Sequence, residues 1–426
     1  MTEIEPLKGI FYNQAKIRDI SCVVCPPYDI ISPAKQEYYH NLHPYNFIHV
    51  LLGKDTPGED KYKRAGNYFR DWIKQGIFIQ DDTPAIYFYA QHYVLKGQRM
   101  HRLGFIALLR LEDKDSQKKV FGHEHTRLEP KEDRLRLLRE IKANLSPIFV
   151  IFPDYRRIIQ RNFQQHIHSE KAFIDITDEE KVEHKLWRLQ SQDTINKIKI
   201  QMQDASIFIA DGHHRYEVAC AFRDEMKSKL SKFTGKESFN YILAYFTNAL
   251  SPGLTVLPIH RLVRLNNNKD IDDLKLGFKE FFDVEEVKDK NRFFFMMAKA
   301  GNTGHVLGMY KCKKYWLLRL KNIKILDRII DDKPREFRLL DVAILNYLVF
   351  KRILQLDPED KERINFIQDA DELIQQTDDD FSSIGFFLNP VKVEQILRVA
   401  QSGYKMPAKS TYFYPKVLSG LIINKL

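Results

Sequence analysis

The residues best suited to chemistry form one short stretch, Asp211-Gly212-His213-His214-Arg215. A glycine in a tight turn before a helix leaves backbone N–H groups and the positive end of the helix dipole free to hold a phosphate. Arg215 would add a two-pronged, charge-assisted contact to the same anion. We therefore predict an anion-binding turn here. The alternative is structural: Asp211 caps the helix and the two histidines face solvent.

A second stretch, His123-Glu124-His125-Thr126, places a carboxylate between two histidines. In an extended chain, alternation would put both histidines on one face and Glu124 on the other. A carboxylate in this setting suits a general base for an alcohol nucleophile. Zinc binding is an alternative, although the H-E-x-x-H spacing that aligns two histidines on a helix is absent. A surface strand end with incidental histidines is the other alternative.

Three further patterns are weaker. His260-Arg261 and Lys409-Ser410-Thr411 could each contact an anion, but taken alone each is interpreted as ordinary surface polarity. Cys22 and Cys25 have redox-motif spacing but lead into two prolines and lack a second pair, so we expect them to pack in the core. The Walker A, Rossmann and G-x-S-x-G motifs do not occur in the sequence, which excludes those three site types.

The elements around the first stretch explain why it would be exposed to a ligand. Residues 206–210 form a short apolar run typical of a buried strand, and the apolar residues after Arg215 keep helical spacing. Two more strands are expected over 240–246 and 253–263. Because α/β proteins bind ligands at the carboxyl ends of their strands, the turn after residue 210 lies where a ligand is expected.

The rest of the chain also alternates between helix and strand. We expect a helix over 60–76, a hairpin of strands over 84–95 and 102–111, a helix over 131–143 and a strand over 148–152. A further helix is expected over 340–353. This alternation predicts an α/β fold of mixed α+β type.

The length of 426 residues suggests two or three domains at about 150 residues each. We expect three regions: residues 1–154, which hold the prolines and the first histidine stretch, residues 155–265 as a nucleotide-binding core, and residues 266–426 as a C-terminal α/β region.

Composition indicates a globular protein, with 44% hydrophobic and 29% charged residues and only 18 Gly and 17 Pro. The net charge of +10 would suit an anionic partner such as a nucleic acid, a membrane surface or a phosphorylated small molecule. Four cysteines and an acidic start favour a reducing, cytoplasmic setting. No run reaches the roughly 18 apolar residues of a spanning helix, so no membrane partner is expected.

Several motifs together resemble the bacterial and archaeal domain-of-unknown-function family 1015 (DUF1015). The resemblance covers nearly the whole chain and rests on motifs in matching order. These motifs are Cys25-Pro26-Pro27-Tyr28-Asp29, His123 to Thr126 with Asp133-Arg134, Asn144 to Phe149, Asp211 to Glu217, Leu257 to Arg261, Leu340 to Ala343 and Met406 to Lys416.

The stretch from Asp211 to Ala219 also resembles the phosphate-binding turn of the ParB and sulfiredoxin superfamily, and most closely that of its free-serine kinases. This resemblance implies a ParB/sulfiredoxin-like nucleotide-binding core with additional mixed-sheet regions. It further implies a kinase of serine metabolism that transfers a phosphoryl group from ATP or ADP to a free amino-acid hydroxyl, giving O-phosphoserine from L-serine.

On this hypothesis each candidate residue has a role. Glu124 is the catalytic base, with Asp211 and His214 as further catalytic residues, and Asp211 also helps to hold Mg²⁺. The nucleotide-binding residues are Gly212, His213, Arg215, Arg134 and Lys409.

Two alternatives stay open. A nucleotide-gated regulatory or DNA-binding protein would suit the ParB resemblance and the basic charge, but basic and acidic residues are interspersed, as over 131–139, so a nucleic-acid partner is not expected. A metal-dependent hydrolase would use the histidine-rich stretches, and stoichiometric zinc that survives dialysis would favour it.

Overall fold

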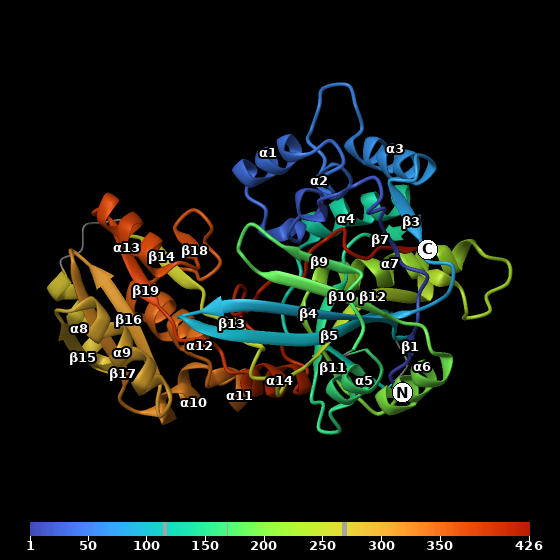
Figure 1. Cartoon of the computed structure of the whole chain (residues 1–426). Helices are drawn as coiled ribbons and strands as arrows, with labels where there is room; N and C mark the ends of the chain where they lie inside the picture. Colours follow the sequence, from blue (N-terminus) through green and yellow to red (C-terminus); the bar gives the residue numbers. More distant parts are fainter. Residues whose placement is uncertain (114–116, 168, 266–270) are drawn as a thin grey trace. The chain divides into compact units, whose positions relative to one another are not determined.

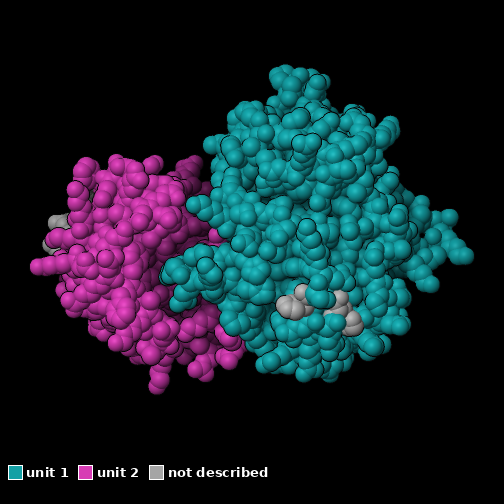
Figure 2. Space-filling view, viewed as in Figure 1, with its two compact units in different colours: residues 1–122, 126–255, 415–426 teal, residues 123–125, 256–414 magenta. Residues whose placement is uncertain are grey.

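The computed structural model describes residues 1–113, 117–167, 169–265 and 271–426. The chain divides into two compact units, coloured separately in Figure 2. Unit 1 holds residues 1–122, 126–255 and 415–426, and unit 2 holds residues 123–125 and 256–414. The domain boundary expected between residues 265 and 266 falls next to residues 266–270, which are not among the described residues. The three predicted regions stay a prediction.

Unit 1 is built on a mixed sheet with the strand order β6-β11-β8-β12-β5-β4-β10-β9, and β1 pairs with β5 (Figure 1). The pairs β6/β11 and β8/β12 are parallel and the others are antiparallel. The predicted mixed α/β class is therefore confirmed. The strands are β1 (Ile4–Glu5), β4 (Ile86–Leu95), β5 (Gln98–Arg110), β6 (Val120–Gly122), β8 (Ile148–Phe152), β9 (Ile174–Thr177), β10 (Glu183–Leu189), β11 (Ile207–Asp211) and β12 (Tyr241–Asn248).

Both faces of this sheet are buried. On β4, Ile86, Phe88 and Ala90 belong to one apolar cluster, whereas the intervening Tyr87 and Tyr89 point to the opposite face and are also buried. Helices α5 (Ile158–His166) and α6 (Gln192–Met202) contribute to that cluster. Helices α4 (Leu128–Ile141) and α7 (His213–Lys229) contribute to a second cluster. The predicted turn lies directly after Asp211, at the end of β11 in this sheet.

The helix predicted over 60–76 and the hairpin predicted over 84–111 are present in unit 1, whereas the strand expected over 253–263 is divided into β13 (Thr255–Leu257) and β14 (His260–Arg264). Helix α3 (Lys61–Lys74) starts where the Asp60 side chain accepts hydrogen bonds from two backbone N–H groups, as an N-cap does. The hairpin β4/β5 turns at Lys96 and Gly97, which both have positive φ. The remaining elements of unit 1 are β2 (Ile10–Tyr12), β3 (Phe78–Gln80), β7 (Ala143–Asn144), β21 (Asn424–Lys425), η1 (Ile20–Cys22), η2 (Tyr28–Ile30), η3 (Ser238–Asn240), α1 (Pro33–Leu42) and α2 (Ile48–Leu51).

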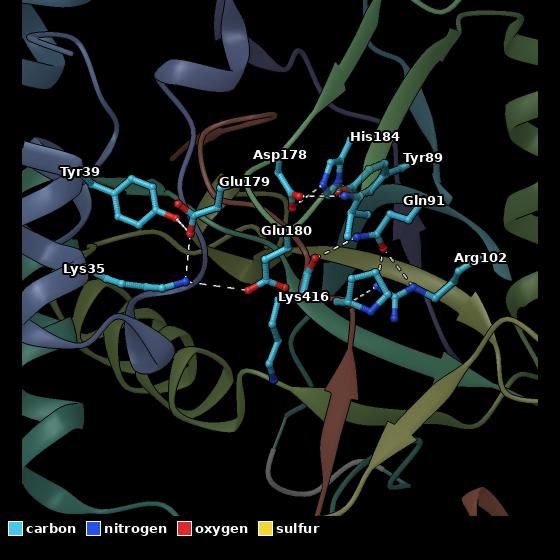
Figure 3. A network of polar contacts seen from close by, with 12 residues as sticks. Lys35, Tyr39, Tyr89, Gln91, Arg102, Asp178, Glu179, Glu180, His184 and Lys416 are labelled. Atoms are coloured by element: carbon cyan, nitrogen blue, oxygen red, sulfur yellow. Dashed lines mark hydrogen bonds and ion pairs between the residues drawn. The ribbon is translucent and has the colours of Figure 1, made fainter. Parts of the chain in front are cut away.

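Ion pairs tie α1 to the sheet. The Lys35 ammonium lies 2.9 Å from Glu179 in the turn between β9 and β10, and the Tyr39 hydroxyl donates to the same carboxylate at 2.6 Å (Figure 3). The preceding residue, Asp178, accepts a hydrogen bond from Nε2 of the buried His184 at 2.9 Å. This turn therefore anchors α1, the helix that follows Tyr28 in the sequence.

Unit 2 is built on an antiparallel sheet with the order β15-β17-β16-β19-β14-β18. On β19 (Ser383–Phe387), Phe387 packs against α9 (Lys290–Gly301), whereas Phe386 contacts α8 (Ile271–Phe281) and the π-helix η5 (Leu345–Leu354). The remaining elements are β13 (Thr255–Leu257), β14 (His260–Arg264), β15 (Phe282–Val287), β16 (Val306–Lys311), β17 (Lys314–Leu320), β18 (Ile364–Ile367), β20 (Tyr412–Tyr414), η4 (Ile323–Ile325), α10 (Leu326–Ile329), α11 (Arg335–Arg338), α12 (Asp341–Ile344), α13 (Ala370–Asp379) and α14 (Val393–Gln401).

The helix expected over 340–353 is present as α12 followed directly by η5. Most of its residues therefore lie in a π-helix, which is wider than an α-helix. Among the described residues, no helix is both long and apolar enough to cross a membrane.

Candidate functional site

The turn between β11 and α7 is the centre of the candidate site. β11 is buried from Ile207 to Ala210 and ends at Asp211, and α7 begins at His213. Between them Gly212 has φ +92°, a left-handed backbone conformation that residues with a side chain rarely adopt. A Cβ at Gly212 would also lie 3.0 Å from the guanidinium of Arg215. The predicted strand, glycine turn and helix start are therefore confirmed.

Asp211 holds two cations at this turn. Its Oδ2 lies 2.6 Å from Nη2 of Arg215, one helical turn ahead, and its Oδ1 lies 2.5 Å from Nζ of Lys416. Burial alone would raise the pKa of Asp211, but the charges of Lys416 and Arg215 outweigh it and hold this pKa well below its usual range. Asp211 is therefore a carboxylate at neutral pH.

Lys416 reaches the turn because the C-terminal segment of the chain returns to unit 1. Gln91 donates to the carbonyl of Lys416 at 2.8 Å, and the buried Arg102 donates to both Gln91 and the carbonyl of Pro415 (Figure 3). Two polar side chains in the middle of the sheet thus fix the backbone that presents the Lys416 ammonium. The predicted site did not include Lys416, although the C-terminal motif of the family resemblance contained it.

One nitrogen of the Arg215 guanidinium has no hydrogen-bond partner in the described residues. Nη1 of Arg215 donates to the carbonyl of Pro147 at 2.5 Å and its Nη2 pairs with Asp211. Its Nε is buried and has no hydrogen-bond partner within the described part of the chain. Because a buried donor without a partner is costly, an acceptor at this position would stabilise the arrangement. A ligand oxygen is such an acceptor.

Arg215 also lines a small cavity of unit 1, of about 60 Å³, which is room for a few water-sized groups. The other polar side chains of its lining are Tyr28, Arg134, Asn144 and Ser146. Three motifs of the family resemblance therefore meet around Arg215. Tyr28 belongs to the Pro-Pro-Tyr-Asp motif but was not predicted as a site residue.

Arg134 lies in this cavity but is already engaged. Its Nε donates to Asp133 at 2.7 Å, its Nη1 donates to the carbonyl of Leu51 at 2.8 Å, and its guanidinium lies 4.3 Å from the ring centroid of Tyr28. Burial, then the charge of Asp29, raises the pKa of Tyr28 to about 12, so this phenol is neutral at physiological pH. These contacts let Arg134 position Tyr28. Its predicted contact with a nucleotide stays a prediction.

The two histidines of the turn have different surroundings. His213 is only 5% exposed and packs beside Gly122, whereas Nε2 of His214 accepts a hydrogen bond from the backbone N–H of Arg127 at 3.0 Å. The alternative of two solvent-facing histidines is therefore wrong for His213. The contact of His214 fixes the start of α4 against the start of α7. Their predicted contacts with phosphate stay predictions.

The other predicted residues, Glu124 and Lys409, belong to unit 2. Glu124 pairs with Met406 in a parallel bridge, and the preceding His123 is 1% exposed with its ring 3.1 Å from the hydroxyl of Thr411. His125 is exposed, so the two histidines do not share one environment. A site shared by Glu124 and the turn at Asp211 stays a prediction.

Lys409 has an exposed side chain and a positive φ of 55°. Its carbonyl accepts a hydrogen bond from Nη2 of Arg261 at 3.0 Å. Arg261 is only 2% exposed, so interpreting it as ordinary surface polarity was wrong. This hydrogen bond therefore joins the His260-Arg261 stretch to the stretch that begins at Lys409.

Asp211 is the predicted ligand of Mg²⁺ in the candidate site. No group of three or more His, Cys, Asp or Glu side chains in the described residues could hold a metal ion. Both carboxylate oxygens of Asp211 are paired with cations, so Asp211 would have to give up one pair to bind Mg²⁺. The predicted role of Asp211 as a ligand of Mg²⁺ therefore stays a prediction.

Comparisons with known proteins place the chain in a family. Similar solved structures include a conserved hypothetical protein from Pyrococcus furiosus (TM-score 0.32, 11% identity, 73% of this chain and 92% of that one). Another is a free serine kinase variant in complex with ADP (TM-score 0.34, 10% identity, 72% of this chain and 87% of that one). A third is SbnI with a C-terminal truncation from Staphylococcus aureus (TM-score 0.37, 10% identity, 74% of this chain and 85% of that one). The search of curated proteins found no match. A family model matches residues 4–343, and the chain therefore belongs to the family described as Protein of unknown function (DUF1015).

Proposed function

We propose that this protein is a small-molecule kinase that transfers a phosphoryl group from ATP or ADP to the hydroxyl of free L-serine. The observation that carries the proposal is the turn at Gly212. It presents the N-terminus of α7 next to Arg215, whose buried Nε has no hydrogen-bond partner in the described residues. Backbone N–H groups and a guanidinium donor at one helix start form the kind of site that binds a phosphate.

Phosphoryl transfer depends mostly on positioning and on neutralising phosphate charge. Arg215 and Lys416 supply two positive charges at the turn, held in place by Asp211. The first backbone N–H groups of α7, with His213 and His214, would donate to the phosphate oxygens. Asp211 would act by positioning the two cations. In phosphoryl-transfer enzymes as a class, Mg²⁺ neutralises phosphate charge.

The reaction forms one bond and breaks one. The serine hydroxyl oxygen bonds to the terminal phosphorus, and the bond from that phosphorus to the bridging oxygen of the nucleotide breaks. The products are O-phosphoserine with ADP from ATP, or with AMP from ADP. Glu124 would take the hydroxyl proton as general base, and Lys409 and Arg134 would add contacts to the nucleotide.

The experiment is an assay for O-phosphoserine with L-serine and each nucleotide, using the full chain. Glu124→Gln should lower turnover about 100-fold or more, since a general base contributes at least that much, while nucleotide affinity is unchanged. Glu129→Gln, which removes an exposed carboxylate five residues further on, is the matched control. Equal turnover of the two variants would remove Glu124 from the mechanism. No product with either nucleotide would sink the proposal.

A further inference from the structure

Unit 2 contains a cavity of about 280 Å³ that the proposed kinase reaction does not use. Its lining includes the basic side chains of Arg261, Lys333, Lys351 and Lys405. Only two carboxylates, Asp357 and Glu359, belong to the same lining. The basic side chains come from four separate parts of unit 2, so the fold gathers positive charge around one hollow.

Arg261 is the buried charge of this cavity. The side chain is 2% exposed, and its Nη1 and Nη2 donate to the main-chain carbonyls of Ile259 at 2.7 Å and Lys409 at 3.0 Å. No carboxylate of the described residues forms an ion pair with it. Burial lowers the pKa of Arg261 to about 9, which expresses the cost of holding this charge out of water. An anion in the cavity would supply the missing countercharge.

Aromatic rings and an unusual helix complete the lining. The guanidinium of Arg261 lies 4.4 Å from the ring centroid of Phe366, and the ammonium of Lys351 lies 4.5 Å from that of Tyr347. Tyr347 and Lys351 both lie on the π-helix η5. π-Helical turns are rare and are found frequently at functional sites. The cavity therefore combines positive charge with flat apolar surfaces.

We propose that this cavity of unit 2 binds a small ligand with at least two negative charges, carried by a phosphate group. Four basic side chains against two carboxylates favour a polyvalent anion over a single carboxylate. Arginine matches phosphate oxygens in a two-pronged geometry and lysine adds point charges, as in known phosphate sites. The proposal concerns a second anion and does not depend on the kinase activity.

The test measures binding of inorganic pyrophosphate to the full chain by titration calorimetry, and compares three single variants. Lys351→Gln and Lys333→Gln remove basic side chains from the cavity. Lys324→Gln removes an exposed charge of unit 2 that does not line it. The lysines are used because Lys351 is exposed and its replacement leaves the core intact, whereas replacing the buried Arg261 would disturb it. Each cavity variant should weaken binding about tenfold, as expected for one lost charge-assisted contact, and the control should not.

The same titrations with AMP identify the source of the phosphate. Tighter binding of AMP than of pyrophosphate, lost in Lys351→Gln, supports an organic phosphate, and the reverse order supports an inorganic one. Titration of Arg215→Gln separates this cavity from the turn in unit 1. Binding of either probe that depends on Arg215 but not on Lys351 would overturn the proposal, as would no binding of either probe.

Discussion

At the scale of single residues, Asp211 determines the electrostatics of the site. It is a nearly buried carboxylate between two cations, Arg215 and Lys416, both within 2.6 Å. Removing one member of such a group leaves the others buried and without their countercharge, which is more costly than losing a surface pair. The ion pairs therefore keep Arg215 directed toward the cavity.

The first prediction follows from that arrangement. Asp211→Asn should lower the free energy of unfolding by about 3 kcal/mol at neutral pH. Because the pKa of Asp211 is lower in the folded protein than in the unfolded chain, its contribution is complete above the unfolded value of about 4 and declines as the pH falls toward the folded value. Urea unfolding from pH 7 to pH 3 should thus show the two proteins converging in acid. A difference that grew in acid would contradict this assignment.

The second prediction concerns Gly212. Gly212→Ala should destabilise the protein because an L-residue at this φ costs about 1–2 kcal/mol and its Cβ would also displace Arg215. Gly97→Ala is the matched control, since Gly97 has φ +78° and open space where its Cβ would lie. Thermal unfolding should show a larger loss for Gly212→Ala, and anion binding should fall only in that variant. Equal losses and unchanged binding would mean that the turn does not need the close approach of Arg215.

At the scale of elements, strand β14 carries a buried titratable group. His260 is 5% exposed, and its Nδ1 accepts a hydrogen bond from the backbone N–H of Leu388 at 3.2 Å. Burial, followed by the charge of Arg261, lowers the pKa of His260 to about 4, against a smaller opposing effect of Asp369. The strand is therefore built around a neutral imidazole.

The third prediction is a pH dependence of stability. The folded pKa of His260 lies below its ordinary 6.5, so its contribution is complete above about pH 6.5 and is lost as the pH falls toward 4. The loss between pH 7 and pH 5 should be about 2 kcal/mol. His260→Asn, which keeps an acceptor but does not titrate there, should have a flatter profile by calorimetry. An unchanged slope would show that His260 does not carry this dependence.

The elements also show what the sequence could predict. The turn at Gly212 was predictable because a buried apolar run, an Asp-Gly pair and helical spacing follow one another directly. Lys416 was not, because its contact with Asp211 spans 205 residues and depends on the return of the C-terminal segment. The burial of Arg261 was also hidden, since the carbonyl of Lys409 that accepts from it lies 148 residues away. The local sequence pattern predicts helices, strands and turns, whereas contacts between residues far apart in the sequence depend on tertiary packing.

At the scale of the whole molecule, the net charge of +10 has a more specific interpretation than the composition allowed. Some of the basic side chains line two cavities, one in each unit. Many of the others form ion pairs, such as Lys35 with Glu179 and Arg139 with Glu225. Basic side chains gathered in hollows favour small anions, whereas a nucleic acid would need an extended basic face.

The central claim is phosphoryl transfer to serine, and phosphorus NMR of the full chain with L-serine tests it most directly. With ATP or with ADP present, we predict a new phosphomonoester signal of O-phosphoserine that grows as the terminal phosphate signal of the donor declines by the same amount. Arg215→Lys, which keeps the charge but loses the two-pronged contact, should slow this conversion without changing the donor. Loss of donor phosphate to inorganic phosphate alone, or no change with either nucleotide, would contradict the claim.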